Sequence, residues 1–241
     1  MSQSPLLPLA LLLLAVAVAG VTAGEVATTS RDQWGAPLDP VPERMVEHTG
    51  GEIDSIVIHH TQTPNRGAPF ERARLRGIQS YHVGERGWGD VAYHYLIGPS
   101  GRIYEGRDPR FQGDSGTDYD LDGRLLVCVI GDFRETLPTR EALASLVEFV
   151  AITARILEVS PEAITTHRMV AATDCPGARF QAWLEREGLD LMARRIAGVD
   201  NPALDPERNP SGEPEIEESE SEESDGTADR PGDRGPREIV K

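Results

Sequence analysis

The sequence predicts a single α/β domain in which a central mixed β-sheet is flanked by helices. Short apolar runs rich in β-branched residues alternate along the chain with longer segments whose apolar residues recur every three or four positions. About 170 to 180 residues lie between an apolar N-terminal segment and an acidic C-terminal tail, which is enough for one domain with a sizeable core. This alternation predicts a sheet covered by helices.

Each expected element has a local signature. Residues 55–59 are a β-branched run, which predicts a strand that ends at a histidine, and Pro69 opens a helical stretch to about residue 85. Residues 91–97 and 102–104, joined by a Pro-Ser-Gly turn, predict a hairpin. The other expected elements are a central strand at 125–130, the clearest helix at 139–157, a turn from Ser160-Pro161, a short strand at 164–167 and a final helix at 180–189.

The N-terminus has the features of an export signal. Residues 6–23 are apolar and uncharged, and small residues at 17–19 and 21–23 offer two cleavage sites. No Lys or Arg precedes the run, which is long enough to span a bilayer, so an uncleaved membrane anchor is the alternative. We expect an exported protein, periplasmic or extracellular, with residues 1–23 as leader and 24–52 as an extension and connector.

The acidic charge of the chain is concentrated at its C-terminal end. The formal net charge is −16, and residues 205–241 contain 13 acidic against 5 basic side chains. This segment has almost no apolar residues, so we expect residues 200–241 to be a disordered, solubilising tail and residues 53–199 to form the functional domain. So acidic a chain is not expected to bind nucleic acid.

Two histidines and one cysteine form a candidate metal site. His59 and His167 each stand where an apolar strand is expected to end, and Cys175 follows His167 by a short loop. Two imidazoles and a thiolate suit zinc, and three protein ligands leave a fourth position open, as in hydrolytic rather than structural zinc sites. Tyr93 is the candidate catalytic partner, because a phenol can hydrogen-bond the attacking water or the developing oxyanion.

The chain has only two cysteines, Cys128 and Cys175. Cys128 lies inside the apolar run 125–130, so we expect it to act as a small buried hydrophobic residue. Cys175 is then available as a metal thiolate, and a disulfide between the two is the alternative in an exported protein.

Ordered sequence blocks across residues 30–189 resemble one known family. They are Ile-Val-Ile-His-His-Thr at 56–61, Gly-Trp-Gly-Asp-Val-Ala-Tyr-His-Tyr-Leu-Ile-Gly at 87–98, Gly-Arg-Ile-Tyr-Glu-Gly-Arg at 101–107, and the His-Arg and Thr-Asp-Cys-Pro-Gly pieces of 167–177. The pattern is similar to the zinc-dependent N-acetylmuramoyl-L-alanine amidases of the type-2 group, which includes peptidoglycan recognition proteins and phage T7 lysozyme. The resemblance implies that fold and a peptidoglycan or muropeptide substrate.

The resemblance also implies roles for individual residues. The zinc ligands correspond to His59, His167 and Cys175, and the catalytic positions to Tyr93 and Thr173. The implied substrate-binding residues are His82 and Arg86, and we add His60, beside the first ligand, and Arg110 as further candidates for substrate binding. The implied reaction is hydrolysis of the amide between N-acetylmuramic acid and L-Ala of the stem peptide, with Zn²⁺ as cofactor.

The chain departs from the family pattern at several positions. No cysteine lies between His59 and Cys128, where animal members commonly form a disulfide, which fits a bacterial secreted enzyme. Asp108-Pro109 replaces the usual Gly-Trp, Arg110-Phe111 occupies the pair that selects the third stem residue, and Ser115 replaces a usual histidine. Arg110 offers a planar bidentate donor set, so we expect it to pair with a diaminopimelate carboxylate.

Other functions remain open on the sequence. A non-catalytic peptidoglycan-binding module is the principal alternative, although such relatives typically lose the cysteine ligand, and Cys175 is present here. A cytoplasmic amidase that recycles muropeptides is disfavoured by the leader. A zinc-stabilised domain without chemistry lacks a fourth ligand.

Overall fold

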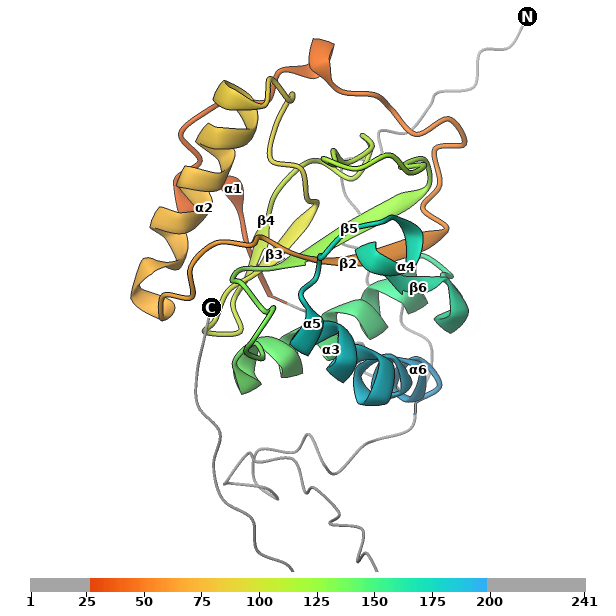
Figure 1. The fold of residues 1–241 in the computed structure, drawn as a ribbon. Coiled ribbons are helices and arrows are strands. Elements are labelled where there is room, and N and C mark those ends of the chain that lie inside the picture. Colours follow the sequence, from red (N-terminus) through yellow and green to blue (C-terminus); the bar gives the residue numbers. More distant parts are fainter. Residues whose placement is uncertain (1–26, 199–241) are drawn as a thin grey trace, which may run out of the picture. The chain divides into compact units, whose positions relative to one another are not determined.

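The computed structural model of this protein describes residues 27–198 (Figure 1). The predicted leader and acidic tail lie outside the described residues. Across 27–198, no helix combines the length and apolar character needed to cross a membrane.

The described residues form one mixed sheet of six strands. In chain order these are β1 (Thr28–Thr29), β2 (Ser55–His60), β3 (Tyr95–Ile97), β4 (Ile103–Glu105), β5 (Arg124–Val129) and β6 (Ile164–Thr166), and their order across the sheet is β1-β4-β3-β5-β2-β6. The β3–β4 hairpin is antiparallel, whereas the other neighbouring strands are parallel. The predicted mixed sheet is confirmed.

Helices lie on both faces of this sheet (Figure 1). They are α1 (Arg31–Trp34), α2 (Glu71–Ser80), α3 (Arg140–Ile156), α4 (His167–Val170), α5 (Ala178–Trp183) and α6 (Leu189–Ile196). Short 3-10 turns occur at Pro42–Arg44, Ala68–Phe70 and Pro161–Ala163, and π-turns at Tyr81–Glu85 and Leu184–Gly188. Helix α3 begins after Thr139, whose hydroxyl accepts a 3.2 Å hydrogen bond from the Ala142 N–H, as an N-cap does.

The alternation of side chains along β2 and β5 divides the core into two clusters. Ile58 and Val127 belong to the larger cluster, which packs against α3, α5 and α6. Cys128 points to the opposite face and joins Trp34 of α1 and Leu75 of α2. Cys128 is fully buried, and both cysteines are free, so the buried role of Cys128 is confirmed and no Cys128–Cys175 disulfide forms.

The hairpin begins later than its sequence pattern predicts. Strand β3 starts at Tyr95 rather than at Val91. The buried Arg107 guanidinium donates to the Val91 and Asp90 carbonyls, and the Arg107 N–H donates to the Tyr93 carbonyl. Since these carbonyls are already engaged by the residues after β4, the segment before β3 does not join a regular ladder.

The last two predicted elements also differ at their ends. Strand β6 stops at Thr166, and His167 opens α4 instead of closing the strand. The final helical region begins at Ala178 and extends through a π-turn to Ile196, because Met192 and neighbouring apolar residues pack against the larger cluster.

Candidate metal centre

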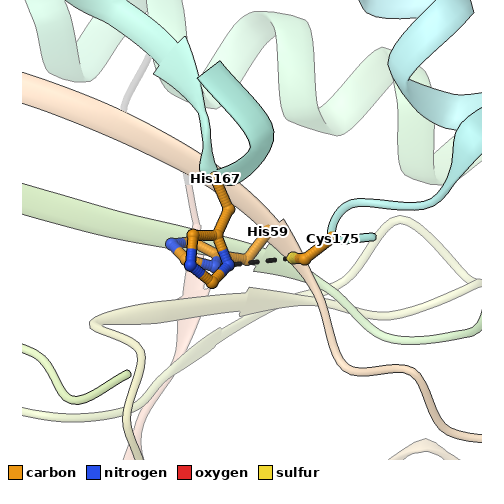
Figure 2. A group of neighbouring side chains, drawn as sticks. All are labelled: His59, His167 and Cys175. Atoms are coloured by element: carbon orange, nitrogen blue, oxygen red, sulfur yellow. Dashed lines mark hydrogen bonds between the residues drawn. The ribbon is translucent and has the colours of Figure 1, made fainter. Parts of the chain in front are cut away.

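His59, His167 and Cys175 converge at one edge of the sheet (Figure 2). The ligand atoms that these three side chains offer all lie within 4.8 Å of one another. Cys175 Sγ lies 3.6 Å from His59 Nδ1, and the two imidazole rings are 4.5 Å apart between centroids. Residues separated by more than one hundred positions therefore form one cluster.

The two histidines lie where parallel strands end, and the cysteine lies in the loop before α5. His59 is the penultimate residue of β2, and His167 follows directly after β6, the strand that pairs with β2 in parallel. Parallel neighbours end at the same edge, so both imidazoles lie there. Cys175 comes from the loop before α5, where Gly177 has a φ of +100° and packs so closely on Phe133 that a Cβ would collide with that backbone.

Burial determines the charge of the three groups. It lowers the pKa of His59 well below its usual value and that of His167 to about 4, so both rings are neutral near pH 7. Burial also raises the pKa of the Cys175 thiol to about 12, opposed by a hydrogen bond from the His60 N–H. Neutral imidazoles are the form that binds a metal ion.

One separation within the cluster matches a tetrahedral zinc ion. Zinc–nitrogen and zinc–sulfur bonds of the usual lengths place a histidine nitrogen and a cysteine sulfur about 3.6 Å apart at a tetrahedral angle. The Sγ–Nδ1 separation of Cys175 and His59 is 3.6 Å. Across residues 27–198, no other group of three or more His, Cys, Asp or Glu side chains is arranged to hold an ion.

The two predicted catalytic residues lie beside this cluster. The Tyr93 ring is 5.4 Å from the His59 ring between centroids, and its hydroxyl lies 3.5 Å from the His60 carbonyl oxygen. Thr173 Oγ1 accepts a 3.2 Å hydrogen bond from the Cys175 N–H. Both hydroxyls are therefore held next to residues that form the cluster.

A row of side chains leads away from Tyr93. His82 lies 5.9 Å from Tyr93 and 4.7 Å from Trp88 between ring centroids, and the Arg86 guanidinium lies 4.6 Å from the Trp88 ring centroid. His82 accepts a hydrogen bond from the Ala92 N–H, which fixes its ring. The predicted substrate-binding residues His82 and Arg86 are thus continuous with the metal cluster through Tyr93.

The other two predicted binding residues lie in different surroundings. The His60 side chain is buried: its Nδ1 accepts from the Phe133 N–H, and its ring lies 6.1 Å from that of Phe133. The backbone N–H of His60, rather than its imidazole, contacts the cluster by donating a hydrogen bond to Cys175 Sγ. The exposed Arg110 guanidinium donates to the Asp108 carboxylate at 3.0 and 2.7 Å.

Three hydroxyl residues at the cluster were not predicted. Thr117 Oγ1 lies 2.5 Å and Ser115 Oγ 3.4 Å from His167 Nε2, and the Tyr119 hydroxyl lies 3.3 Å from His59 Nε2. All three belong to residues 106–123, a long polar segment of the kind that often carries function, although its composition does not show which side chains reach the site.

Comparison with known proteins agrees with this fold. The family model described as N-acetylmuramoyl-L-alanine amidase, Amidase_2, matches residues 49–178. The chain is 33% identical over 156 residues to peptidoglycan-recognition protein LB of Drosophila melanogaster, covering 64% of this chain and 65% of that protein. It is 34% identical over 158 residues to the human N-acetylmuramoyl-L-alanine amidase, covering 61% of this chain and 26% of that protein.

Solved structures show the same architecture. Drosophila peptidoglycan recognition protein SD superimposes with a TM-score of 0.61 at 28% identity, covering 67% of this chain and 95% of that one. Wild-type Drosophila PGRP-LB gives a TM-score of 0.59 at 29% identity, with 67% and 94% coverage. The domain thus has the peptidoglycan recognition protein fold, and the chain belongs to the N-acetylmuramoyl-L-alanine amidase family, Amidase_2.

Proposed function

We propose that this protein is a zinc-dependent N-acetylmuramoyl-L-alanine amidase that hydrolyses the amide between N-acetylmuramic acid and L-Ala of the peptidoglycan stem peptide. The observation that carries this proposal is the convergence of His59, His167 and Cys175 within 4.8 Å, next to Tyr93. Three ligands of this kind leave one tetrahedral position for the reacting groups. Membership of the amidase family supports the same reaction.

The three ligands would hold the ion through His59, His167 and the thiolate of Cys175. When bound, zinc supplies Lewis acidity toward the scissile carbonyl and lowers the pKa of a coordinated water. The two imidazoles stay neutral through burial, so they need not lose a proton. The thiol of Cys175 must lose its proton, and the His60 N–H that points at its sulfur favours the thiolate.

Tyr93 would act as a hydrogen-bond donor to the developing oxyanion. Burial raises the pKa of its phenol well above the usual value, with further contributions from the two cysteines, so the group keeps its proton near pH 7. A protonated phenol can donate to negative charge but is a poor general base. Thr173 would assist, because its oxygen accepts from the Cys175 N–H while its own proton remains available for donation.

The row from Tyr93 through His82 to Arg86 would contact the muropeptide. Relatives of known structure support this substrate class. Peptidoglycan recognition protein LE was solved in complex with tracheal cytotoxin, a monomeric diaminopimelic acid-type peptidoglycan. A point mutant of Drosophila PGRP-LB was solved in complex with the same ligand. The apolar residues 6–23 support export to a compartment where peptidoglycan is accessible. In this proposal residues 53–199 form the zinc amidase domain and 200–241 a solubilising tail.

Digestion of purified peptidoglycan by the purified full chain, with mass analysis of the products, tests this function. We expect free stem peptides and intact glycan strands, loss of activity with a chelator, and recovery with zinc. Cys175→Ala is the matched variant, because it removes one ligand and leaves Tyr93 in place. Retention of peptidoglycan without cleavage by the zinc-loaded protein would instead identify a recognition module.

A further inference from the structure

Residues 106–123, which connect β4 to β5, present their hydroxyl groups to the two histidines of the metal cluster. Thr117 Oγ1 lies 2.5 Å from Nε2 of His167. The Tyr119 hydroxyl lies 3.3 Å from Nε2 of His59. In both rings the hydroxyl thus meets the same nitrogen, Nε2, although His59 lies in β2 and His167 is the first residue of α4.

These contacts leave Nδ1 of each ring for the ion. Nδ1 of His59 lies 3.6 Å from Cys175 Sγ, on the side of the ring away from Tyr119. A neutral imidazole carries one proton, and an acceptor placed at Nε2 holds that proton there and exposes the Nδ1 lone pair. An oxygen acceptor beyond the ring thereby selects the tautomer and the ring orientation that a metal ion needs.

The contact to His167 belongs to a directed chain of hydrogen bonds. When Nε2 of His167 donates to Thr117 Oγ1, the Thr117 hydroxyl can donate to Ser115 Oγ, 3.0 Å away. Ser115 Oγ also accepts from the Thr117 N–H at 3.1 Å. The Thr117 N–H therefore holds the Ser115 hydroxyl, and that hydroxyl in turn fixes the Thr117 side chain. Ser115 is the residue that stands in place of the usual histidine.

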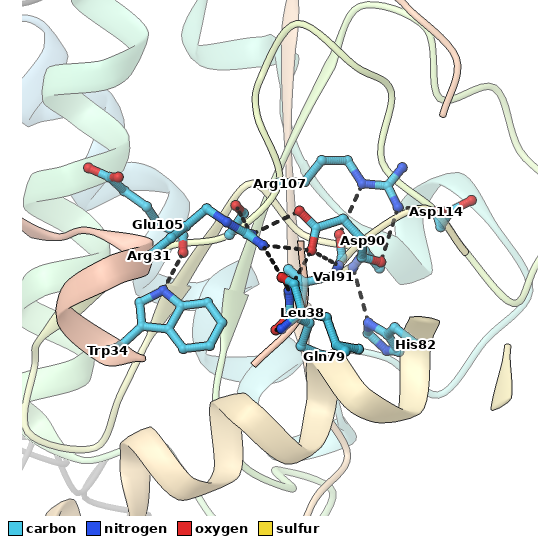
Figure 3. A network of polar contacts seen from close by, with 12 residues as sticks. Arg31, Trp34, Leu38, Gln79, His82, Asp90, Val91, Glu105, Arg107 and Asp114 are labelled. Carbon is cyan, nitrogen blue, oxygen red and sulfur yellow. Dashed lines mark hydrogen bonds and ion pairs between the residues drawn. The ribbon is translucent and has the colours of Figure 1, made fainter. Parts of the chain in front are cut away.

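Buried groups hold this segment against the rest of the domain. Arg107 is 2% exposed and donates to the carbonyls of Val91 and Gln112 while pairing with Asp114, the residue before Ser115 (Figure 3). His94 Nε2 lies 2.9 Å from the carbonyl oxygen of Phe111. His48 Nδ1 accepts from the Gly123 N–H at 2.8 Å. The hydroxyls are thus carried by a segment anchored at its start, middle and end.

We infer that Thr117 and Tyr119 are positioning residues for the metal centre, which act by holding Nε2 of His167 and His59 so that both Nδ1 atoms face the ion. This inference rests on the proposed function, because it requires that the cluster binds zinc. Neither residue need touch the substrate or the reacting atoms. Thr117 has the stronger effect, because its contact is shorter and is supported by Ser115.

Zinc affinity of the full chain, measured by competition with a chromophoric chelator, tests the inference without a substrate. Thr117→Val keeps the shape of the side chain and removes its hydroxyl, and Tyr119→Phe does the same for the phenol. We expect roughly a 10- to 100-fold loss of affinity for Thr117→Val, a smaller loss for Tyr119→Phe, and recovery in Thr117→Ser. The ring ¹⁵N shifts of the zinc-loaded protein should show metal-bound Nδ1 and protonated Nε2.

Matched controls separate this effect from a general loss of stability. Thr28→Val removes the hydroxyl of a threonine in β1 that donates to Glu105 of β4 at 2.7 Å, and Tyr95→Phe removes the hydroxyl of a tyrosine whose ring packs on Phe149 of α3. Both controls should bind zinc as the unaltered protein does. Unchanged affinity in the Thr117→Val/Tyr119→Phe double variant would overturn the inference alone, whereas absence of zinc binding by the unaltered chain would overturn the proposed function with it.

Discussion

The backbone N–H of His60 donates a hydrogen bond to Sγ of Cys175 over 3.3 Å, which joins the end of β2 to the loop before α5. The bond favours the thiolate, while burial of the thiol outweighs it and raises the Cys175 pKa to about 12. The sulfur is therefore a protonated thiol near pH 7 until an ion binds, whereas His59 and His167 are already neutral.

Zinc binding should for this reason release more protons from the native chain than from Cys175→Asp at pH 7. The ordinary pKa of a carboxyl group lies about 4 to 5 pH units below that of a thiol, so more of the aspartate is ionised before zinc binds even though burial raises its pKa, and it still offers an oxygen ligand. The measurement is titration of the metal-free proteins with zinc in weak buffer containing a pH indicator. Equal proton release from the two proteins would mean that the thiol does not bind the ion.

Tyr93→Phe should lower kcat by roughly 100-fold or more while leaving zinc affinity unchanged, because the phenol would donate to charge that develops only in the transition state. The ring contact with His59, 5.4 Å between centroids, is preserved in this variant. Steady-state kinetics on a soluble muropeptide, together with chelator competition, distinguish the two effects. A parallel loss of zinc affinity would show that Tyr93 supports the metal rather than the oxyanion.

The buried His94 ring should make stability fall as the pH decreases. Its Nδ1 accepts from the Leu126 N–H, and burial lowers its pKa to about 3, so the folded protein excludes a proton that the unfolded chain takes up below about pH 6.5. The linkage amounts to about 2 kcal/mol between pH 7.5 and pH 5.

Denaturant unfolding of metal-free protein at these two pH values measures that difference. His94→Asn keeps an acceptor for the Leu126 N–H but cannot take up a proton. Between pH 7.5 and pH 5 its free energy of unfolding should therefore fall by about 2 kcal/mol less than that of the unaltered protein, even if the variant is less stable at both pH values. An identical decrease in both proteins would mean that other groups account for the pH dependence.

Thr139 caps α3 and also ties it to the hairpin. Its hydroxyl accepts from the Ala142 N–H and donates to the Pro99 carbonyl at 2.7 Å. Thr139→Ala should lower the free energy of unfolding by about 1 to 2 kcal/mol, and Thr139→Ser should recover most of it. Denaturant midpoints of the three proteins provide the comparison, and a change below about 0.5 kcal/mol would contradict the capping role.

Arg110 and Asp108 offer a paired test of stem-peptide selectivity. The Asp108 carboxylate engages the Arg110 guanidinium in the free protein, so it competes with any anionic group of the substrate. Arg110→Ala should reduce the preference for diaminopimelate-type over lysine-type muropeptides, and Asp108→Asn should increase it. Ratios of kcat/KM for the two substrates measure this, and unchanged ratios in both variants would remove Arg110 from the specificity site.

The sequence alone predicted the elements whose local signals agree with their packing. The apolar periodicity of α3 and the β-branched run of β2 specified those elements closely, since the same residues that favour the local structure also face the core. The segment before β3 was predicted as strand, because its composition favours β-structure. The competing hydrogen bonds come from Arg107, which is distant in sequence.

The sequence by itself also predicted His59, His167 and Cys175 as candidate metal ligands, because two histidines and a cysteine are chemically distinctive, and the structure brings them within 4.8 Å of one another. Only the tertiary structure placed Thr117 beside Nε2 of His167 and Tyr119 beside Nε2 of His59. The sequence does not single out these two residues, because they are common polar residues within a long loop. Their positions follow from buried contacts of Arg107, His94 and His48, and such contacts exist only once the chain has folded.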